Sequence, residues 1–168
     1  MSKQPEAIIK LLEERGVTLI AIADIVKKLQ SPYVKGITTE QCLESVIRVL
    51  GKREVQYTLY TGIALDQLAE QNLLPQPLQE IIENDEPLYG VDEILAFGIT
   101  NVYGSIGLTS FGYLDKEKIG IIRELDHHED KIHTFLDDLV AGIAAAASAR
   151  IAHGAIKSHV DEVSEDIE

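Results

Sequence analysis

The 168-residue sequence contains no tryptophan, and aromatic residues make up only 5% of it. Sandwiches and barrels of strands rely on aromatic and β-branched side chains, whereas helix formers such as Ala, Leu, Glu, Lys and Gln are abundant here. A chain of this length buries roughly two-thirds of the surface that it exposes when unfolded, enough for one core. We therefore expect an all-α fold, with a single helical domain over residues 1–156.

Basic residues and cysteine are also scarce. The chain has 15 Lys and Arg against 28 Asp and Glu, giving a net charge of −13, which repels nucleic acid. The single cysteine, Cys42, cannot form an intramolecular disulfide, and the N-terminus has an amphipathic helical pattern rather than that of a signal peptide. We expect a cytoplasmic protein that does not bind nucleic acid.

The sequence predicts no membrane-spanning segment. Its most apolar stretch, 136–151, is shorter than the ~20 residues needed, is largely alanine and ends beside Arg150. We expect no integral membrane segment. The acidic residues 157–168 lack an apolar period and cannot offset an ordering cost of about 1–2 kcal/mol per residue, which predicts a flexible C-terminal tail.

Helical periodicity covers most of the chain. Apolar stripes ending at Gly16 and Pro32 predict two short helices, and a third is introduced by Thr38 and Gln41, which have the spacing of a capping box. A longer helix follows over 52–71, and Pro77 suits the first turn of a short helix ending near Asn84. The glycines of 104–112 indicate a bend or a broken helix.

The last helix is predicted to begin at Thr134 and to occupy the centre of the fold. It is apolar on nearly every side, including the alanines of 144–147. Small side chains admit close neighbours, so we expect a compact multi-helix bundle around this alanine-rich helix.

Carboxylates recur around this predicted core. Asp92 stands at the head of an apolar stripe with Leu95 and Ile99, and Glu93 is adjacent. A buried ionised carboxylate needs a partner, and Asp85 reaches the same point if the turn over 87–90 folds back. A shared cation is one way to satisfy both.

Asp137 and Asp138 fall in the first turn of the central helix, at the rim of the core. Oxygen-only sites suit hard cations, above all Mg²⁺ held by a few carboxylates, water and phosphate oxygens. Lys118, three residues after Asp115 and at the start of another predicted helix, can place a positive charge on that phosphate. Together these groups suit metal-assisted phosphoester hydrolysis.

Structural roles compete with this interpretation. Thr134 and Asp137 also fit the start of a capped helix, and Asp115 is a good N-cap for its own helix. Asp85 is by default a turn residue. The three histidines of 127–133 match no common zinc signature, and we expect all of them in a solvated loop.

Three blocks then occur in a recognisable order. They are Asp85 followed after six residues by Asp92-Glu93, then Leu114-Asp115 followed after two residues by Lys118, then Asp137-Asp138-Leu139-Val140-Ala141-Gly142. This set resembles the phosphatidylglycerophosphatase A family, and specifically its branch of the low-temperature-requirement C type. Asp126 also matches a family aspartate.

The resemblance implies Mg²⁺-dependent removal of the terminal phosphate from phosphatidylglycerophosphate. It implies that Asp85, Asp92, Glu93, Asp137 and Asp138 are metal ligands. It implies a catalytic set of Asp92, Glu93, Asp115, Lys118 and Asp138. Gly142 would be a packing position.

Three hypotheses follow. The first is a Mg²⁺-dependent phosphatase acting on a phosphorylated small molecule or a phospholipid head group. The second keeps the metal but makes the protein a binding or regulatory module that recognises a phosphorylated ligand without turnover. The third treats the acids as caps and surface charge on a helical homo-oligomer.

Overall fold

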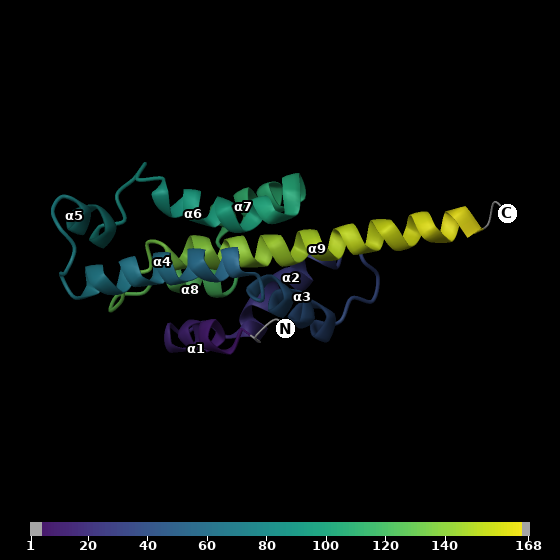
Figure 1. Cartoon of the computed structure of the whole chain (residues 1–168), viewed down its shortest axis with the longest axis horizontal. Coiled ribbons are helices and arrows are strands. Elements are labelled where there is room, and N and C mark those ends of the chain that lie inside the picture. The colour runs from purple at the N-terminus through teal and green to yellow at the C-terminus, as the bar shows by residue number, and fades with distance from the viewer. Residues whose placement is uncertain (1–4, 166–168) are drawn as a thin grey trace.

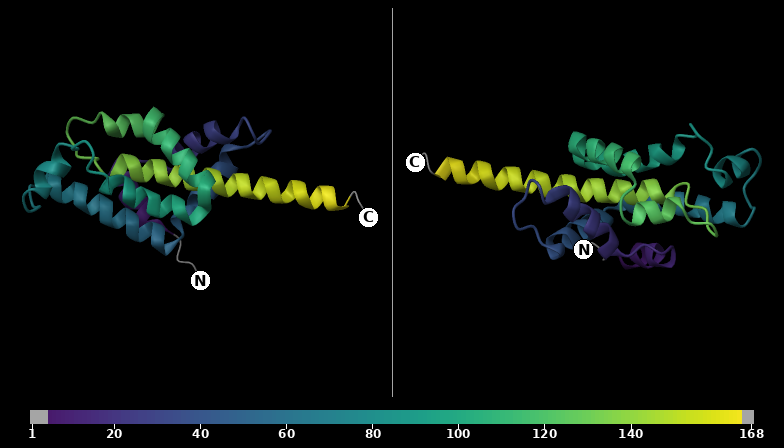
Figure 2. Two further views of the ribbon diagram at one scale, coloured as in Figure 1. Left: turned by 90° about the horizontal axis from the view of Figure 1, so that it is seen from above. Right: turned by 180° about the vertical axis from the view of Figure 1, so that it is seen from behind.

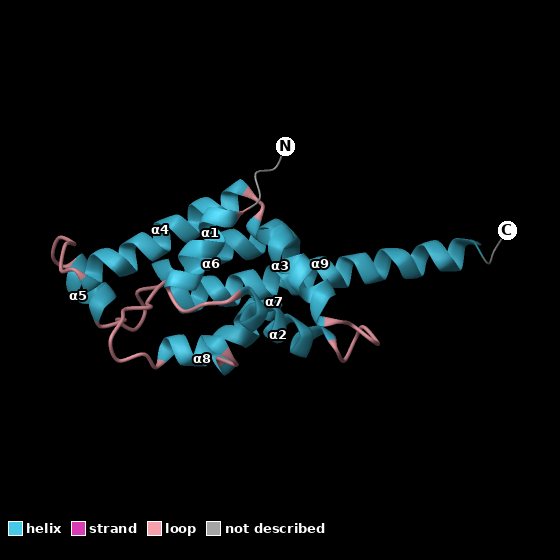
Figure 3. Cartoon of the chain, turned by 90° about the horizontal axis from the view of Figure 1, so that it is seen from below, coloured by secondary structure: helices cyan, strands magenta, loops and turns pink. Residues whose placement is uncertain are grey.

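The chain folds into a series of helices, seen in a computed structural model that describes the backbone of residues 5–165 and the side chains of 5–155 (Figures 1 and 3). No strand occurs in this described part, so the predicted all-α class is confirmed. The elements are α1 (Glu6–Glu14), α2 (Leu19–Gln30), α3 (Thr39–Leu50), α4 (Arg53–Glu70), α5 (Leu78–Glu83), α6 (Val91–Thr100), the 3₁₀ turn η1 (Asn101–Tyr103), α7 (Gly104–Glu117), α8 (Ile121–Asp126) and α9 (Leu136–Glu165).

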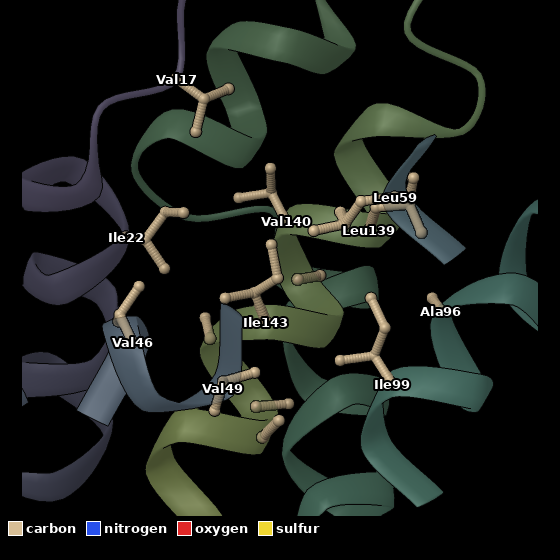
Figure 4. Close-up of a cluster of buried hydrophobic side chains, with 14 of the residues drawn as sticks. Val17, Ile22, Val46, Val49, Leu59, Ala96, Ile99, Leu139, Val140 and Ile143 are labelled. Carbon is tan, nitrogen blue, oxygen red and sulfur yellow. The ribbon is translucent and has the colours of Figure 1, made fainter. Parts of the chain in front are cut away.

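Helix α9 is the centre of the bundle, as predicted. Helices α6 and α7 lie along one side of it and α2 and α3 along the other (Figure 1). Every residue over 133–149 is buried. Figure 4 shows Leu139, Val140 and Ile143 of α9 surrounded by apolar side chains of the neighbouring helices. Gly142 is a packing position, because a Cβ there would lie 3.2 Å from the Ala96 backbone oxygen of α6.

The C-terminal part of α9 projects beyond the bundle (Figure 2). The helix continues to Glu165 and so includes much of the segment that we expected to be a flexible tail. The side chains of 156–168 and the backbone of 166–168 lie outside the described residues, so the tail stays a prediction.

Local caps account for several helix starts. The Thr38 hydroxyl accepts a hydrogen bond from the Gln41 N–H at 3.2 Å, and the Gln41 side chain accepts one from the Thr38 N–H at 2.9 Å. This confirms the predicted capping box at α3. The Thr18 hydroxyl caps α2 in the simpler way, by accepting from the Ala21 N–H.

Helices α6 and α7 form a hairpin, with the break where the glycines predicted one. Gly104 has a φ of 76°, which glycine adopts without the clash that a Cβ causes. Helix α7 then returns beside α6, and the Phe97 and Phe111 rings lie 5.1 Å apart, edge to face. The stretch Val91–Glu117 is long and apolar enough to cross a membrane by length and composition, but the fold divides it into helices of 10 and 14 residues.

Candidate functional site

Four helix ends meet at the start of α9, and they bring the predicted site residues together. Asp92 and Glu93 lie in the first turn of α6, and Asp115 and Lys118 lie at the end of α7. Asp126 ends α8, Asp137 and Asp138 lie in the first turn of α9, and Asp85 lies in the loop before α6. They are close enough that the charges of neighbouring carboxylates help to raise the pKa values of Asp85, Glu93 and Asp138.

Lys118 carries the positive charge of this cluster. Its Nζ lies 3.0 Å from Asp137 Oδ2 and 3.6 Å from an oxygen of both Asp115 and Asp126. Burial opposes the ammonium charge, but the surrounding carboxylates outweigh it, Asp137 first, and raise the pKa of Lys118. The lysine therefore stays charged at any physiological pH.

The backbone at Lys118 differs from our expectation. We predicted that a helix starts here with Asp115 as its N-cap, which is wrong, because α7 runs to Glu117 and Lys118 follows as its C-cap. The residue has a φ of 45° and a ψ of 62°, in the left-handed region, and its N–H donates to the Leu114 carbonyl at 2.8 Å. This turn directs the chain into α8 and leaves Asp115 one helical turn from the lysine.

Asp137 and Asp138 are the most deeply buried acids of the cluster, only 5% and 4% exposed. Asp137 Oδ1 accepts from the Asp138 N–H at 2.9 Å, and its other oxygen faces Lys118. The capping interpretation of Thr134 with Asp137 is wrong, because the Thr134 hydroxyl donates to the Ile82 carbonyl at 2.6 Å.

The environment of this acid pair disfavours negative charge. Burial raises the pKa of Asp137, an effect that Lys118 partly offsets. Burial also raises the pKa of Asp138, and the charges of Asp137, Asp92 and Asp115 raise it further. Two adjacent buried carboxyls with raised pKa values hold protons more tightly than free aspartates do, and such perturbed groups are common in acid–base centres.

The three remaining acids line the α6 side of the cluster. Asp92 is 9% exposed, and its Oδ1 accepts from the Glu93 N–H at 3.0 Å. Desolvation raises the pKa of Glu93, and the charges of Asp115 and Asp92 add to it. Asp85 has a φ of 47° and lies on the surface. The pKa of its carboxyl is raised, first by partial loss of solvent and then by the charge of Asp92. The turn before α6 thus brings Asp85 near Asp92, as the sequence predicted.

Asp66 of α4 holds the start of α9 in place, and the sequence analysis did not identify it. Its fully buried carboxyl accepts from the Phe135 N–H at 3.0 Å and from the Leu136 N–H at 3.0 Å. It therefore caps α9 from another helix, since the first amides of a helix lack intrahelical partners. Burial raises the pKa of Asp66 to about 8 against the effect of these two hydrogen bonds.

A second anchor fixes the loop that leads into α9. Arg15 makes two hydrogen bonds to Glu70, of 3.0 and 2.6 Å, and a third of 2.9 Å to the Ile132 carbonyl. Glu70 in turn accepts from the Ile132 N–H at 2.9 Å. This closed set of bonds ties the segment before Asp137 to α1 and α4.

A small polar recess opens beside the acid pair. It has a volume of about 180 Å³, and its lining includes Asp85, Asp126, Lys131, His133 and Asp137. The expectation that all three histidines lie in a solvated loop is wrong for His133, which is only 7% exposed. Its Nδ1 bonds to the Leu125 carbonyl at 2.9 Å, and burial lowers its pKa, so the ring is neutral at neutral pH.

The donor set suits a hard cation, although it is not arranged around one point. Among residues 5–155, no three Asp, Glu, His or Cys side chains are grouped in a way that could hold a metal ion. Asp137 is instead oriented toward Lys118. The charges of Asp92 and Asp115 raise the cost of ionising Asp138, and a divalent cation would relieve it. Mg²⁺ fits these oxygen donors if side chains of the cluster turn toward it.

The fold is an all-helical bundle with acids gathered at the start of its central helix, and comparison with known proteins identifies its family. Residues 16–153 match the family model of phosphatidylglycerophosphatase A, and the chain belongs to that family. The resemblance seen in the sequence is thereby confirmed.

Individual relatives cover nearly the whole chain. YpjQ of Bacillus subtilis is 62% identical over 143 residues, which are 85% of this chain and 81% of YpjQ. YutG of the same organism is 55% identical over 145 residues, or 86% of this chain and 87% of YutG. The crystal structure of the low temperature requirement C protein from Listeria monocytogenes superposes with a TM-score of 0.87 at 51% identity, covering 92% of this chain and 98% of that one.

Proposed function

We propose that this protein is a Mg²⁺-dependent phosphatase that removes the terminal phosphate from a phosphorylated lipid head group, phosphatidylglycerophosphate. One observation carries the proposal: an ammonium group, Lys118, lies among carboxylates directly beside the buried acid pair Asp137 and Asp138. Such a cluster can neutralise a phosphate and move a proton at the same place. Membership of the phosphatidylglycerophosphatase A family supports this choice of substrate.

In this proposal Asp85, Asp92, Glu93, Asp137 and Asp138 are the residues that hold Mg²⁺. The cation, when bound, neutralises charge on the phosphate oxygens during transfer. Lys118 donates hydrogen bonds to the same phosphate. Its separations of 3.6 Å from Asp115 and Asp126 are longer than good hydrogen bonds, so N–H groups of the ammonium remain to be shared with a ligand.

The proton transfers fall to the acids. As a water oxygen forms its bond to phosphorus, Asp138 takes one water proton, and the bond from phosphorus to the head-group oxygen breaks. The departing alcohol oxygen takes a proton from solvent water, and Asp138 then releases the proton that it accepted to the solvent, so the products are an alcohol and inorganic phosphate. Asp115 lies within hydrogen-bond reach of the Asp138 carboxyl and positions it. With Mg²⁺ held by the cluster, Asp138 would be ionised, and the raised pKa that burial gives its carboxyl would make it a stronger base than a free aspartate.

Phosphate release from phosphatidylglycerophosphate, measured with and without Mg²⁺, tests the proposal. We expect release only with Mg²⁺, and a loss of about 10²–10⁴-fold in Asp138→Asn, since this substitution removes the proton acceptor. The exposed Asp24 on α2 offers the matched control Asp24→Asn, which should keep full activity. Native-like thermal unfolding of both variants separates lost chemistry from lost folding.

The same samples, with Asp92→Asn added, decide between catalysis and the alternative binding module. Mg²⁺ should raise the unfolding temperature of the native protein and do so less in Asp92→Asn, because a ligand that binds only the folded state stabilises it by mass action. Phosphate release that is independent of Mg²⁺ and of Asp138 would refute the Mg²⁺-dependent mechanism proposed for this site. Mg²⁺-dependent binding of phosphate esters without any release would favour the binding module.

A further inference from the structure

The α6–α7 hairpin is unusual in this chain because, apart from its two ends, it has no charged side chains. Residues 94–114 include no Asp, Glu, Lys, Arg or His, although charged residues make up 26% of the whole sequence. The lack of charged side chains does not reflect burial, since only 28% of the most apolar 18-residue segment within Val91–Glu117 is buried. An uncharged and exposed helical hairpin on a protein of net charge −13 indicates a surface that meets something apolar.

The exposed apolar side chains begin next to the candidate site. Leu88, Val91, Ile94 and Phe97 are 102%, 41%, 63% and 39% exposed, and we refer to these four residues as the hairpin face. On α6, Val91, Ile94 and Phe97 follow one another at intervals of three, on the side opposite the buried Asp92, Ala96 and Ile99. Three of the four residues of the hairpin face thus lie on α6, the helix that carries Asp92 and Glu93 of the site.

Leu88 adds a second, independent observation. It lies between Asp85 and Asp92, is fully exposed, and has a φ of 68°. The left-handed region is unfavourable for a bulky side chain, and water is an unfavourable surrounding for leucine. Leu88 thus combines an unfavourable backbone conformation with an apolar side chain in water. Contact with an apolar partner would remove the exposure to water.

We propose that the hairpin face docks on the surface of a lipid bilayer composed mainly of zwitterionic lipids, with the acid cluster held against the head groups. This inference rests on the proposed function, because a site for a lipid phosphate has to reach the membrane surface. The occupant is a neutral lipid surface because residues 88–114 contain no Lys or Arg with which to attract an anionic one. A second copy of the chain fits less well, since pairing through these residues would place two carboxylate clusters side by side.

Flotation with phosphatidylcholine vesicles tests this docking without any need for turnover. We expect the native protein to float with the vesicles, and Leu88→Gln/Ile94→Gln to show a partition coefficient about tenfold lower, since two apolar side chains no longer enter the bilayer. Glutamine leaves the net charge unchanged. The matched control Ile20→Gln/Ile47→Gln alters two exposed isoleucines on the opposite side of α9 and should float like the native protein.

The outcomes separate docking from catalysis. Asp138→Asn should float normally, and Leu88→Gln/Ile94→Gln should lose activity on vesicles containing phosphatidylglycerophosphate while keeping it on the soluble ester para-nitrophenyl phosphate. Floating without phosphate release would remove the proposed function and leave the docking intact. A native protein that stays with the buffer, or equal flotation of the two double variants, would overturn the docking. So would light scattering that shows a dimer dissociated by Leu88→Gln/Ile94→Gln.

Discussion

Removing the Asp66 carboxyl should loosen the start of the central helix. In Asp66→Ala the Phe135 and Leu136 N–H groups lose their acceptor in a fully buried place. Each unsatisfied buried donor costs about 1–3 kcal/mol, so the free energy of unfolding should fall by about 2–5 kcal/mol. For a domain of this size that corresponds to a drop of about 5–15 °C in the unfolding temperature. Asp66→Asn keeps an acceptor and should lose much less.

The pH dependence gives a sharper test of the same residue. Burial raises the pKa of Asp66 from 3.8 to about 8, so the folded protein holds this proton more tightly than the unfolded chain does. The stability that this raised pKa contributes is complete at a pH below the pKa of Asp66 in the unfolded chain. It is lost as the pH rises through the pKa of Asp66 in the folded protein. Between pH 5 and pH 9 the native protein should lose on the order of 4 kcal/mol from this group, whereas Asp66→Asn lacks this loss.

Urea unfolding followed by far-UV circular dichroism measures both effects. The native protein, Asp66→Asn and Asp66→Ala should be compared at pH 5, 7 and 9, with the exposed Asp24→Ala as control. The reasoning fails if Asp66→Ala is as stable as the native protein at pH 7. It also fails if the difference between the native protein and Asp66→Asn does not fall as the pH rises.

Two further substitutions probe the site and the packing around it. Lys118→Met removes the partner of Asp137, and since Lys118 is partly exposed we expect urea unfolding at pH 8 to show a loss of only about 1–3 kcal/mol. The loss should be smaller at pH 5. Without the ammonium the pKa of Asp137 in the folded protein rises further, so protonation at pH 5 removes the unpaired charge. Equal losses of stability at both pH values would contradict this. Gly142→Val places its side chain against the Ala96 carbonyl and should lower the unfolding free energy by about 1–3 kcal/mol, whereas an unchanged unfolding temperature would show that α6 and α9 can separate without cost.

The sequence was sufficient for those parts of the fold that depend on local rules. Thr38 and Gln41 are three residues apart, so their reciprocal hydrogen bonds follow from spacing alone. The central position of α9 follows from an apolar surface on all sides, which no exposed helix can keep. The end of α7 was missed because Lys118 in the left-handed region stops the helix where glycine or asparagine would be expected.

The acids of the site were found from their order along the chain, but their supports were not. Asp66 lies 69 residues before the Phe135 N–H that it accepts from, and Arg15 lies 55 residues before Glu70. Pairings across such separations leave no periodic pattern in the sequence. The one available signal was Asp66 itself, an acid within the otherwise apolar inner side of α4. A buried acid on the apolar face of a helix is therefore a signal for a cap on a distant helix as well as for a bound ligand.

The left-handed backbone at Lys118 has a consequence for how this chain could change. Glycine and asparagine adopt that conformation with less strain than lysine, so selection for thermal stability alone would act on the backbone of this position and favour them. The phosphate chemistry that we propose for the acid cluster needs an ammonium at the same residue. Robust folding and activity thus make opposite demands at a single position, and a variant library selected only for heat tolerance would lose the charge on which we base the proposed function.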